Sequence, residues 1–300
     1  MKVFLTGATG QLGQGLIASR PPEVELIACS RGELDLADAD ACRAAVQQHR
    51  PDWVLNAGAY TAVDKAESEP ELAAAVNAGA PAAFAEALAA TGGRLLQVST
   101  DFVFNGAQGS PYRPEQRLDP LGVYGATKAA GEAAALQLPG ARLLRTSWVY
   151  GPVGKNFCLT MLRLHALKAA AGESLGVVAD QVGCPTSTLT LAAACWRAIG
   201  VGADPAADPS GPRILHWSDA GVASWYDFAV AIGELGVQAG LLERAARVKP
   251  LTTADYPTPA QRPSYSLLDC TASRAALGLE PLHWREGLAE VLRCMAAARP

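Results

Sequence analysis

Tyr124 and Lys128 are the residues of this chain whose types and spacing most clearly suggest chemistry. They lie four residues apart in the sequence Tyr-Gly-Ala-Thr-Lys. On a helix this spacing places the two side chains one above the other on the same face. A neighbouring ammonium favours the phenolate, so we expect Lys128 to lower the pKa of Tyr124 from its usual value of about 10. A tyrosine tuned in this way is a candidate proton donor to a carbonyl oxygen.

Two segments upstream of this pair fit the same chemistry. Thr100 lies at the end of an apolar run, where its hydroxyl could hold the carbonyl oxygen. Gly7, Gly10 and Gly13 follow the first apolar run, and glycines between a strand and a helix let the backbone turn tightly and approach a pyrophosphate. The spacing GxxGxxG differs from the usual GxGxxG, so a plain tight turn is the alternative. In this order the segments indicate a carbonyl reductase that takes hydride from a bound dinucleotide.

The end of the second expected strand bears on which dinucleotide is bound. An acidic residue there binds the ribose 2′-hydroxyl of NADH and repels the 2′-phosphate of NADPH. Ser30 and Arg31 stand at this place instead, and a guanidinium can form two parallel hydrogen bonds with a phosphate. We therefore favour NADPH, with NADH and a solvent-exposed Arg31 as the alternative. Asp35, a little further on, is a candidate contact of the adenine.

The composition sets these residues in a cytoplasmic α/β protein. Half of the 300 residues are apolar, which is enough for one large or two modest domains. Acidic residues number 29 and basic residues 25, and no run of Lys or Arg indicates nucleic acid as a partner. The seven cysteines lack any CxxC pair and predict reduced thiols, and the four histidines show no metal-binding spacing. We expect no signal peptide, because the glycine turn comes so early, and no apolar stretch long enough to span a membrane.

Strand-like apolar runs alternate with helical patterns through the first half of the chain. This alternation predicts a mostly parallel, doubly wound α/β sheet of the Rossmann type with helices on both faces. Asp38 is the expected N-cap of the second helix, and the third helical run should be interrupted near Gly79-Ala80-Pro81. The expected strands are 3–5, 24–29, 53–55, 95–98 and 143–144, and the expected helices are 11–19, 38–49, 71–90 and 124–138.

After Gly151 the alternation weakens, which predicts a smaller C-terminal α/β domain. We assign 1–150 to the dinucleotide-binding domain, with return segments at about 175–217, and 151–174 together with 218–300 to the substrate domain. The segment 200–212 is expected to be a surface loop, and 256–263, with its three prolines, an irregular loop. The expected helices of this half are 156–171, 189–199, 224–235 and 284–298, and its expected strand is 175–178.

Several longer segments of the chain carry a more specific pattern than the Tyr-Lys pair. They are 10–13, 56–67, 99–106, 120–128, 145–150, 156–157, 180–186 and 256–263. These segments resemble the extended short-chain dehydrogenase/reductase family, and within it the dTDP-4-dehydrorhamnose reductases. The likeness covers almost the whole chain, and the segments of the second half are the most specific. The resemblance implies reduction of the C4 ketone of dTDP-4-dehydro-β-L-rhamnose by NADPH to give dTDP-L-rhamnose.

The resemblance also implies a role for individual residues. Tyr124 would donate the proton, Lys128 would lower its pKa and bind the nicotinamide ribose, and Thr100 would position the carbonyl or tune Tyr124. Trp148 would be an apolar platform for a deoxysugar with an N–H to donate, and Arg262 a partner for the diphosphate. The implied cofactor contacts are Gly10, Gln11, Leu12, Asp35, Leu36, Ala59, Tyr60 and Thr61, and the implied sugar-nucleotide contacts are Thr100, Asp101, Trp148, Asn156 and Arg262.

The sequence departs from the family pattern at two places. Phe102 stands where a tyrosine is common, so any hydroxyl contact there is lost. Gly15 and Leu189 occupy positions at which some relatives bind magnesium through glutamates and form dimers, and neither side chain supplies the oxygen ligands that magnesium needs. We therefore expect no metal, and either a monomer or a homodimer. Two other functions stay open: a sugar-nucleotide 4-epimerase that keeps NAD bound, and a non-catalytic NADP-binding regulatory subunit, against which the intact catalytic trio argues.

Overall fold

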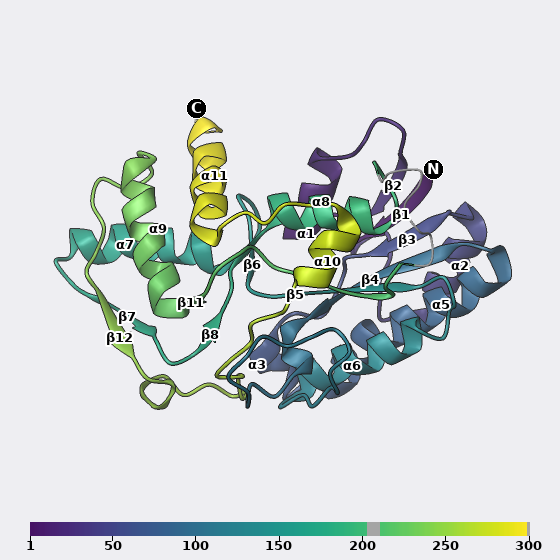
Figure 1. Ribbon diagram of the computed structural model, residues 1–300, viewed down its shortest axis with the longest axis horizontal. Coiled ribbons are helices and arrows are strands. Elements are labelled where there is room, and N and C mark those ends of the chain that lie inside the picture. Colours follow the sequence, from purple (N-terminus) through teal and green to yellow (C-terminus); the bar gives the residue numbers. More distant parts are fainter. Residues whose placement is uncertain (203–210, 299–300) are drawn as a thin grey trace.

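The computed structural model describes residues 1–202 and 211–298, and a six-stranded sheet forms the centre of the larger of two units (Figure 1). Neighbouring strands run parallel in the order β10-β5-β4-β3-β1-β2, which confirms the predicted doubly wound sheet. The strand order reverses between β1 and β3, and ligands of open α/β sheets bind beyond the carboxyl ends of the strands at such a point. The strands are β1 (Lys2–Thr6), β2 (Glu25–Cys29), β3 (Trp53–Asn56), β4 (Arg94–Thr100), β5 (Arg142–Thr146) and β10 (Ile214–Trp217).

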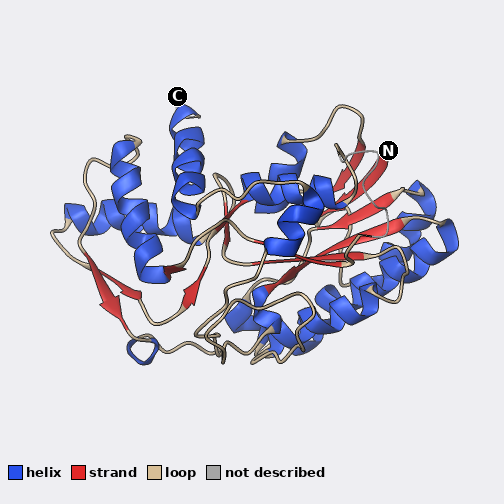
Figure 2. Ribbon diagram, viewed as in Figure 1, coloured by secondary structure: helices blue, strands red, loops and turns tan. Residues whose placement is uncertain are grey.

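Alternating side chains of the strands enter two separate cores, one on each face of the sheet. Figure 2 shows the helices that flank the sheet. Along β1, Val3 and Leu5 belong to one core and Phe4 to the other, and all three are fully buried. Burial on both faces explains why these strands are continuous apolar runs in the sequence. Helices α1 (Gln11–Ala18) and α8 (Thr188–Ala198) cover the first core, and α2 (Ala39–His49), α5 (Ala80–Thr91) and α6 (Val123–Ala135) cover the second.

The helical run at 70–91 is continuous, so the predicted interruption near Gly79-Ala80-Pro81 is wrong. Helix α4 (Pro70–Ala74) passes through a π-helical turn, η1 (Ala75–Gly79), directly into α5. Pro81 breaks nothing because it lies in the first turn of α5, where a wider π turn precedes it. By length and composition the run could also cross a membrane, contrary to our expectation, but 56% of its most apolar stretch is buried inside the protein, as in a core helix.

The smaller unit is built around α7 (Phe157–Ala170), α9 (Trp225–Gln238) and α11 (Trp284–Ala297), at the left of Figure 1. The segment 256–263 is irregular, as predicted, whereas residues 203–210 of the other predicted loop lie outside the described residues. The remaining elements are short: α3 (Val63–Ala66), η2 (Asp101–Val103), η3 (Thr253–Asp255), α10 (Thr271–Leu277), and the strand pairs β6 (Val149–Tyr150) with β9 (Thr186–Ser187), β7 (Leu175–Val178) with β12 (Val248–Leu251), and β8 (Val182–Gly183) with β11 (Ala223–Ser224).

The cores place two segments differently from the predicted division of the chain. Leu175 and Val177 pack in the core of the smaller unit, and β7 pairs with β12, so 175–178 does not return to the large sheet as we expected. Strand β10 and helix α8 do return to it. Leu277 of α10 also packs in the core of the larger unit, although we assigned 218–300 to the substrate domain. The chain therefore crosses between the units more often than the sequence predicts.

Candidate active site

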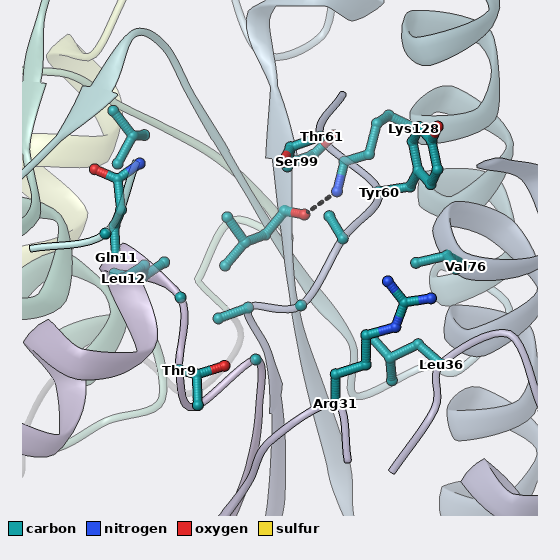
Figure 3. A pocket seen from close by; sticks show the side chains of 18 of the residues that line it. Thr9, Gln11, Leu12, Arg31, Leu36, Tyr60, Thr61, Val76, Ser99 and Lys128 are labelled. Atoms are coloured by element: carbon teal, nitrogen blue, oxygen red, sulfur yellow. Dashed lines mark hydrogen bonds between the residues drawn. The ribbon is translucent and has the colours of Figure 1, made fainter. Parts of the chain in front are cut away.

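A cavity of about 530 Å³ opens where β1, β3 and β4 end (Figure 3). It extends from Arg31 at the end of β2 to Tyr124 and Lys128 on α6. The cavity therefore joins the glycine turn to the Tyr-Lys pair, as the sequence predicts. Of the predicted site residues, the cavity is lined by Gly7, Gly10, Gln11, Leu12, Arg31, Asp35, Leu36, Ala59, Tyr60, Thr61, Tyr124 and Lys128; Gly13, Ser30, Thr100, Asp101, Trp148, Asn156 and Arg262 do not line it.

The glycine turn is a position where side chains are excluded. Gly7 has φ +69°, and a Cβ there would lie 2.8 Å from the backbone of Gly58 at the end of β3. A Cβ on Gly13 would lie 2.1 Å from the Gly7 carbonyl oxygen, so Gly13 lets α1 pack directly against the turn. The Gly10 N–H donates to the same carbonyl at 2.8 Å. These close approaches favour a dinucleotide-binding turn over a plain tight turn. A bound diphosphate needs a backbone without side chains beside it.

At the end of β2, Arg31 is exposed, and Figure 3 shows its guanidinium between Leu36 and Val76 at the cavity. The sequence analysis overlooked Glu33, whose carboxylate accepts the Ser30 N–H at 2.7 Å. This hydrogen bond lowers the pKa of Glu33, and Glu33 does not line the cavity. Among the described residues of the cavity, Arg31 therefore supplies the guanidinium that could meet the 2′-phosphate of a dinucleotide.

The pKa of Tyr124 is raised, so our prediction that Lys128 lowers it is wrong for this structure. Burial raises the pKa of Tyr124 to about 12, and burial lowers the pKa of Lys128 to about 8. The Lys128 ammonium donates to the carbonyl oxygen of Val98 at 2.7 Å (Figure 3). Burial therefore determines the pKa of Tyr124, because Lys128 directs its charge to the Val98 carbonyl and not to the phenol four residues before it.

Thr100 and Asp101 adjoin Tyr124 from the end of β4. The Thr100 hydroxyl favours the Tyr124 phenolate, and it also donates to Asp101 Oδ1 at 3.0 Å. Asp101 is 2% exposed, and burial raises its pKa to about 6 against the opposing effect of the Ser266 and Thr100 hydroxyls. Phe102, which we noted as a departure, packs edge-on against Tyr124 with 5.6 Å between the rings. Thr100 therefore lies between the half-buried phenol of Tyr124 and the buried carboxyl group of Asp101.

Several buried polar atoms around the cavity have no hydrogen-bond partner among the described residues. They include Ser99 Oγ and Thr146 Oγ1, both from cavity-lining residues at the ends of β4 and β5, and Gln11 Oε1 at the glycine turn. Buried polar groups are ordinarily satisfied, so these atoms are suited to a polar ligand. Together with the side-chain-free turn and Arg31, they fit a phosphorylated dinucleotide.

Trp148 is held rigidly outside the cavity. Its φ is +46°, which is unusual for a bulky residue, and its indole stacks on Trp225 with 3.6 Å between the ring centroids and an angle of 6°. A Cβ on Gly183 would lie 2.6 Å from the Trp148 ring and 2.8 Å from Ser266 Oγ. Because Ser266 also neighbours Asp101, the structure brings the predicted sugar contacts Trp148 and Asp101 into one neighbourhood. The sequence analysis did not identify Trp225.

Asn156 and Arg262 are engaged by the protein itself. Asn156 caps α7 by accepting the Leu159 N–H at 2.9 Å, and its amide donates to the carbonyl of Gly151 at 2.9 Å. Arg262 pairs through two nitrogens with both carboxylate oxygens of Asp64, at 2.8 and 3.0 Å. Their predicted contacts with the sugar nucleotide stay predictions.

Gly15 and Leu189, at the positions where some relatives bind magnesium, supply no side-chain ligand for a metal ion. A Cβ on Gly15 would lie 3.3 Å from the Thr188 carbonyl oxygen, and Leu189 is 37% exposed. Within 1–202 and 211–298, no group of three or more His, Cys, Asp or Glu side chains could hold a metal ion. Metal independence stays a prediction for solution measurements.

Asn77 and Lys155 are two site residues that the sequence analysis missed. Asn77 is 2% exposed in the π-helical turn η1; its Oδ1 accepts the Tyr60 N–H at 2.9 Å, and its Nδ2 donates to Thr127 Oγ1 at 3.1 Å. It thus joins the cavity-lining segment of Tyr60 to the helix of Tyr124. The only sign of Asn77 in the sequence was the helix interruption that we expected just after it, near Gly79-Ala80-Pro81. Lys155 lines the cavity from a loop that shows no motif of its own.

Comparisons with known proteins agree with this geometry. The family model described as RmlD substrate binding domain matches residues 1–297. A dTDP-4-dehydrorhamnose reductase of Streptomyces griseus is 43% identical over 303 residues, which cover 99% of this chain and 95% of the relative.

Solved structures of similar proteins superpose over nearly the whole chain. That of a dTDP-4-dehydrorhamnose reductase of Clostridium acetobutylicum has a TM-score of 0.87 at 35% identity and covers 98% of this chain and 99% of its own. That of the Bacillus anthracis reductase in complex with NADP has a TM-score of 0.85 at 33% identity, with 97% and 98% covered. A UDP-glucose 4-epimerase of Thermus thermophilus, at 20% identity and a TM-score of 0.75, shares the fold.

Proposed function

The chain belongs to the RmlD substrate binding domain family, and we propose that it reduces the C4 ketone of dTDP-4-dehydro-β-L-rhamnose with NADPH to give dTDP-L-rhamnose. The observation that carries this proposal is the single cavity that joins the glycine turn to Tyr124 and Lys128. A dinucleotide in the cavity would supply hydride at the end where Tyr124 can supply the proton. We further propose that the sugar nucleotide binds where the two units meet, beside Asp101 and Trp148.

The residues at the dinucleotide end have separate roles in this proposal. Backbone N–H groups at the start of α1, around Gly10 and Gln11, hold the diphosphate of NADPH, and Arg31 pairs with its 2′-phosphate. Lys128 hydrogen-bonds the nicotinamide ribose in place of, or together with, the Val98 carbonyl. NADPH supplies the hydride, and every other step uses groups of the chain itself.

Tyr124 donates the proton to the C4 oxygen of the sugar. A phenol whose pKa is about 12 is fully protonated at neutral pH, which is the form that a donor must have. The Thr100 hydroxyl favours the phenolate that forms as the proton leaves. Trp148, fixed by its stack on Trp225, supplies an apolar surface beside the deoxysugar.

Oxidation of NADPH with a panel of 4-keto sugar nucleotides tests the proposal. We expect turnover with dTDP-4-dehydro-β-L-rhamnose, and slower or no turnover when dTDP is replaced by another nucleotide. Purified protein that carries tightly bound NAD and interconverts C4 epimers would instead identify an epimerase. Binding of NADP without turnover of any substrate would identify the regulatory subunit.

The protein is proposed to act in the cytoplasm, as a monomer or homodimer. All seven cysteines are free thiols, and burial raises the pKa of the six that are at least partly buried, which makes them weak nucleophiles. A protein without disulfides is suited to a reducing compartment.

A further inference from the structure

Among the described residues, three lysine or arginine side chains line the cavity: Arg31, Lys128 and Lys155. Arg31 stands at the end of β2, where the 2′-phosphate of the proposed cofactor belongs. The Lys128 ammonium bonds the Val98 carbonyl at the opposite end, near Tyr124. Lys155 comes from the loop between β6 and α7, whereas Lys128 lies on α6.

The loop of Lys155 is fixed against the glycine turn. Gln11 Nε2 donates to the Lys155 carbonyl oxygen at 3.3 Å. Gly154 has φ +81°, and a Cβ there would lie 3.0 Å from Gln11 Cγ, so the loop lies directly on Gln11. The Asn156 amide then ties the loop to itself through the Gly151 carbonyl and begins α7. Lys155 is therefore held opposite the first turn of α1.

The glycine turn itself carries no charge to meet a diphosphate. Residues 7–18 include neither an acidic nor a basic side chain. The N-terminus of a helix supplies only about half of an elementary charge, whereas the diphosphate of a dinucleotide is a dianion at neutral pH. Lys155 is exposed, and none of the ion pairs among the described residues involves it. Lys155, which pairs with no carboxylate among the described residues, thus lies across the cavity from the glycine turn, which has no cation of its own.

We propose that Lys155 binds the diphosphate of the dinucleotide, opposite the backbone N–H groups of the glycine turn. This inference rests on the proposed function, because it takes the bound cofactor to be a nicotinamide dinucleotide. It assigns the two ends of the cofactor to different cations: Arg31 binds the 2′-phosphate, which NADH lacks, and Lys155 binds the diphosphate, which both cofactors share. The two residues should therefore differ in which ligands they affect.

Calorimetric titration with NADP⁺, NAD⁺ and adenosine 2′-phosphate separates these roles. Lys155→Ala should weaken NADP⁺ and NAD⁺ by the same factor, about 10- to 100-fold for a lost charge-assisted hydrogen bond, and leave adenosine 2′-phosphate unchanged. Arg31→Ala should weaken NADP⁺ and adenosine 2′-phosphate and spare NAD⁺. Lys155→Arg should keep most of the affinity, and Lys249→Ala, an exposed lysine of β12, should behave as wild type.

Three results would overturn the proposal for Lys155. One is unchanged affinity of Lys155→Ala for both dinucleotides. Another is a loss confined to NADP⁺, which would place Lys155 at the 2′-phosphate. The third is an equal loss for adenosine 2′-phosphate, which would show a general distortion of the cavity. Failure of the wild-type protein to bind either dinucleotide would instead reject the proposed function, so the two failures are distinguishable.

Discussion

Tyr124 combines a high pKa with two neighbours that act on it in opposite directions. The Thr100 hydroxyl favours its phenolate, whereas the negative charge of Asp101 disfavours it. The phenol is therefore kept protonated until a substrate oxygen can accept the proton. A proton donor must be in its acidic form at neutral pH, and the raised pKa of Tyr124 ensures this.

Replacement of Tyr124 by Phe tests this role at a single atom. We expect kcat to fall by about 10²-fold or more, the usual scale of general acid catalysis, with NADP⁺ affinity close to that of the wild type. Stopped-flow NADPH oxidation and calorimetric titration measure the two quantities. The matched variant Tyr226→Phe removes a hydroxyl from α9 of the smaller unit and should retain kcat. Near wild-type turnover of Tyr124→Phe would remove Tyr124 from the mechanism.

Asp101 should make the free energy of unfolding depend on pH. Its pKa is raised from 3.8 to about 6, so the folded protein retains a proton that the unfolded chain has lost, and stability decreases as pH rises from about 4 to about 6. The loss amounts to about 3 kcal/mol, and Asp101→Asn avoids it. Urea denaturation should therefore show the variant gaining stability relative to the wild type between pH 4 and pH 7.

Other titrating groups, including Asp219 with a pKa also raised to about 6, are present in both proteins and cancel in this comparison. Asp40→Asn, at a side chain that is 97% exposed, should show no such trend. If the free energies of unfolding of Asp101→Asn and the wild type differ by a constant amount across this pH range, Asp101 ionises in the folded protein at little cost.

Site residues could be predicted from the sequence where their chemistry is local. The glycine turn and the Tyr124-Lys128 pair are contiguous patterns, and they line one cavity as expected. The direction of the Tyr124 pKa could not be predicted, because burial and the Val98 carbonyl come from tertiary packing. Lys155 and Trp225 were missed for the same reason: nothing near them in sequence indicates their neighbours.

At the scale of elements, α6 is positioned by close contact with the π-helical turn η1. A Cβ on Gly131 would lie 2.0 Å from the Asn77 carbonyl oxygen. Because that oxygen belongs to the backbone, it could not move aside as a side chain would. The same turn holds Thr127 and the Tyr60 segment through the Asn77 side chain. The register of α6, and with it the position of Tyr124, thus depends on this contact.

Gly131→Ala should separate α6 from η1. We expect a loss of about 1–3 kcal/mol in the free energy of unfolding, as for other overpacked interiors, together with a lower kcat because Tyr124 moves. Gly109→Ala is the matched control, since Gly109 has open space around it and a φ outside the left-handed region. Urea denaturation and NADPH oxidation measure both effects. Full stability of Gly131→Ala would show that the two helices can separate at no cost.

The alternation of elements predicts five of the six strands of the large sheet, because these strands are largely apolar. Strands β10 and β12, of four residues each, were missed. The continuity of 70–91 was not predictable, because a π turn compensates for Pro81 and leaves no pattern in the sequence. Strands of two residues, such as β6 and β9, were missed because such segments carry no periodicity.

At the scale of the whole molecule, Arg262 and Asp64 connect the irregular loop 256–263 to α3 of the larger unit. Asp64 accepts a hydrogen bond from each terminal nitrogen of Arg262, and the pair lowers the pKa of Asp64. If Arg262 binds the sugar nucleotide, the ligand competes with Asp64 for the guanidinium.

Asp64→Asn should therefore strengthen the binding of dTDP, by a factor of a few for a partly exposed pair, and Arg262→Ala should weaken it. Calorimetric titration of dTDP measures both changes, and Asp40→Asn, which removes an exposed carboxylate that pairs with Arg43, serves as the control. If Asp64→Asn and Arg262→Ala weaken dTDP equally, the pair acts as a structural support and Arg262 does not contact the ligand.

Strand β10 has a consequence for how the chain is made. It pairs with β5, yet about seventy residues separate the two strands in sequence. During synthesis the first five strands can leave the ribosome while the backbone groups along one side of β5 have no partner. An uncovered strand edge readily recruits other chains. The nascent protein therefore passes through a period of exposure that ends only when residue 217 emerges, and chaperones that shield strand edges would matter most to this protein in that period.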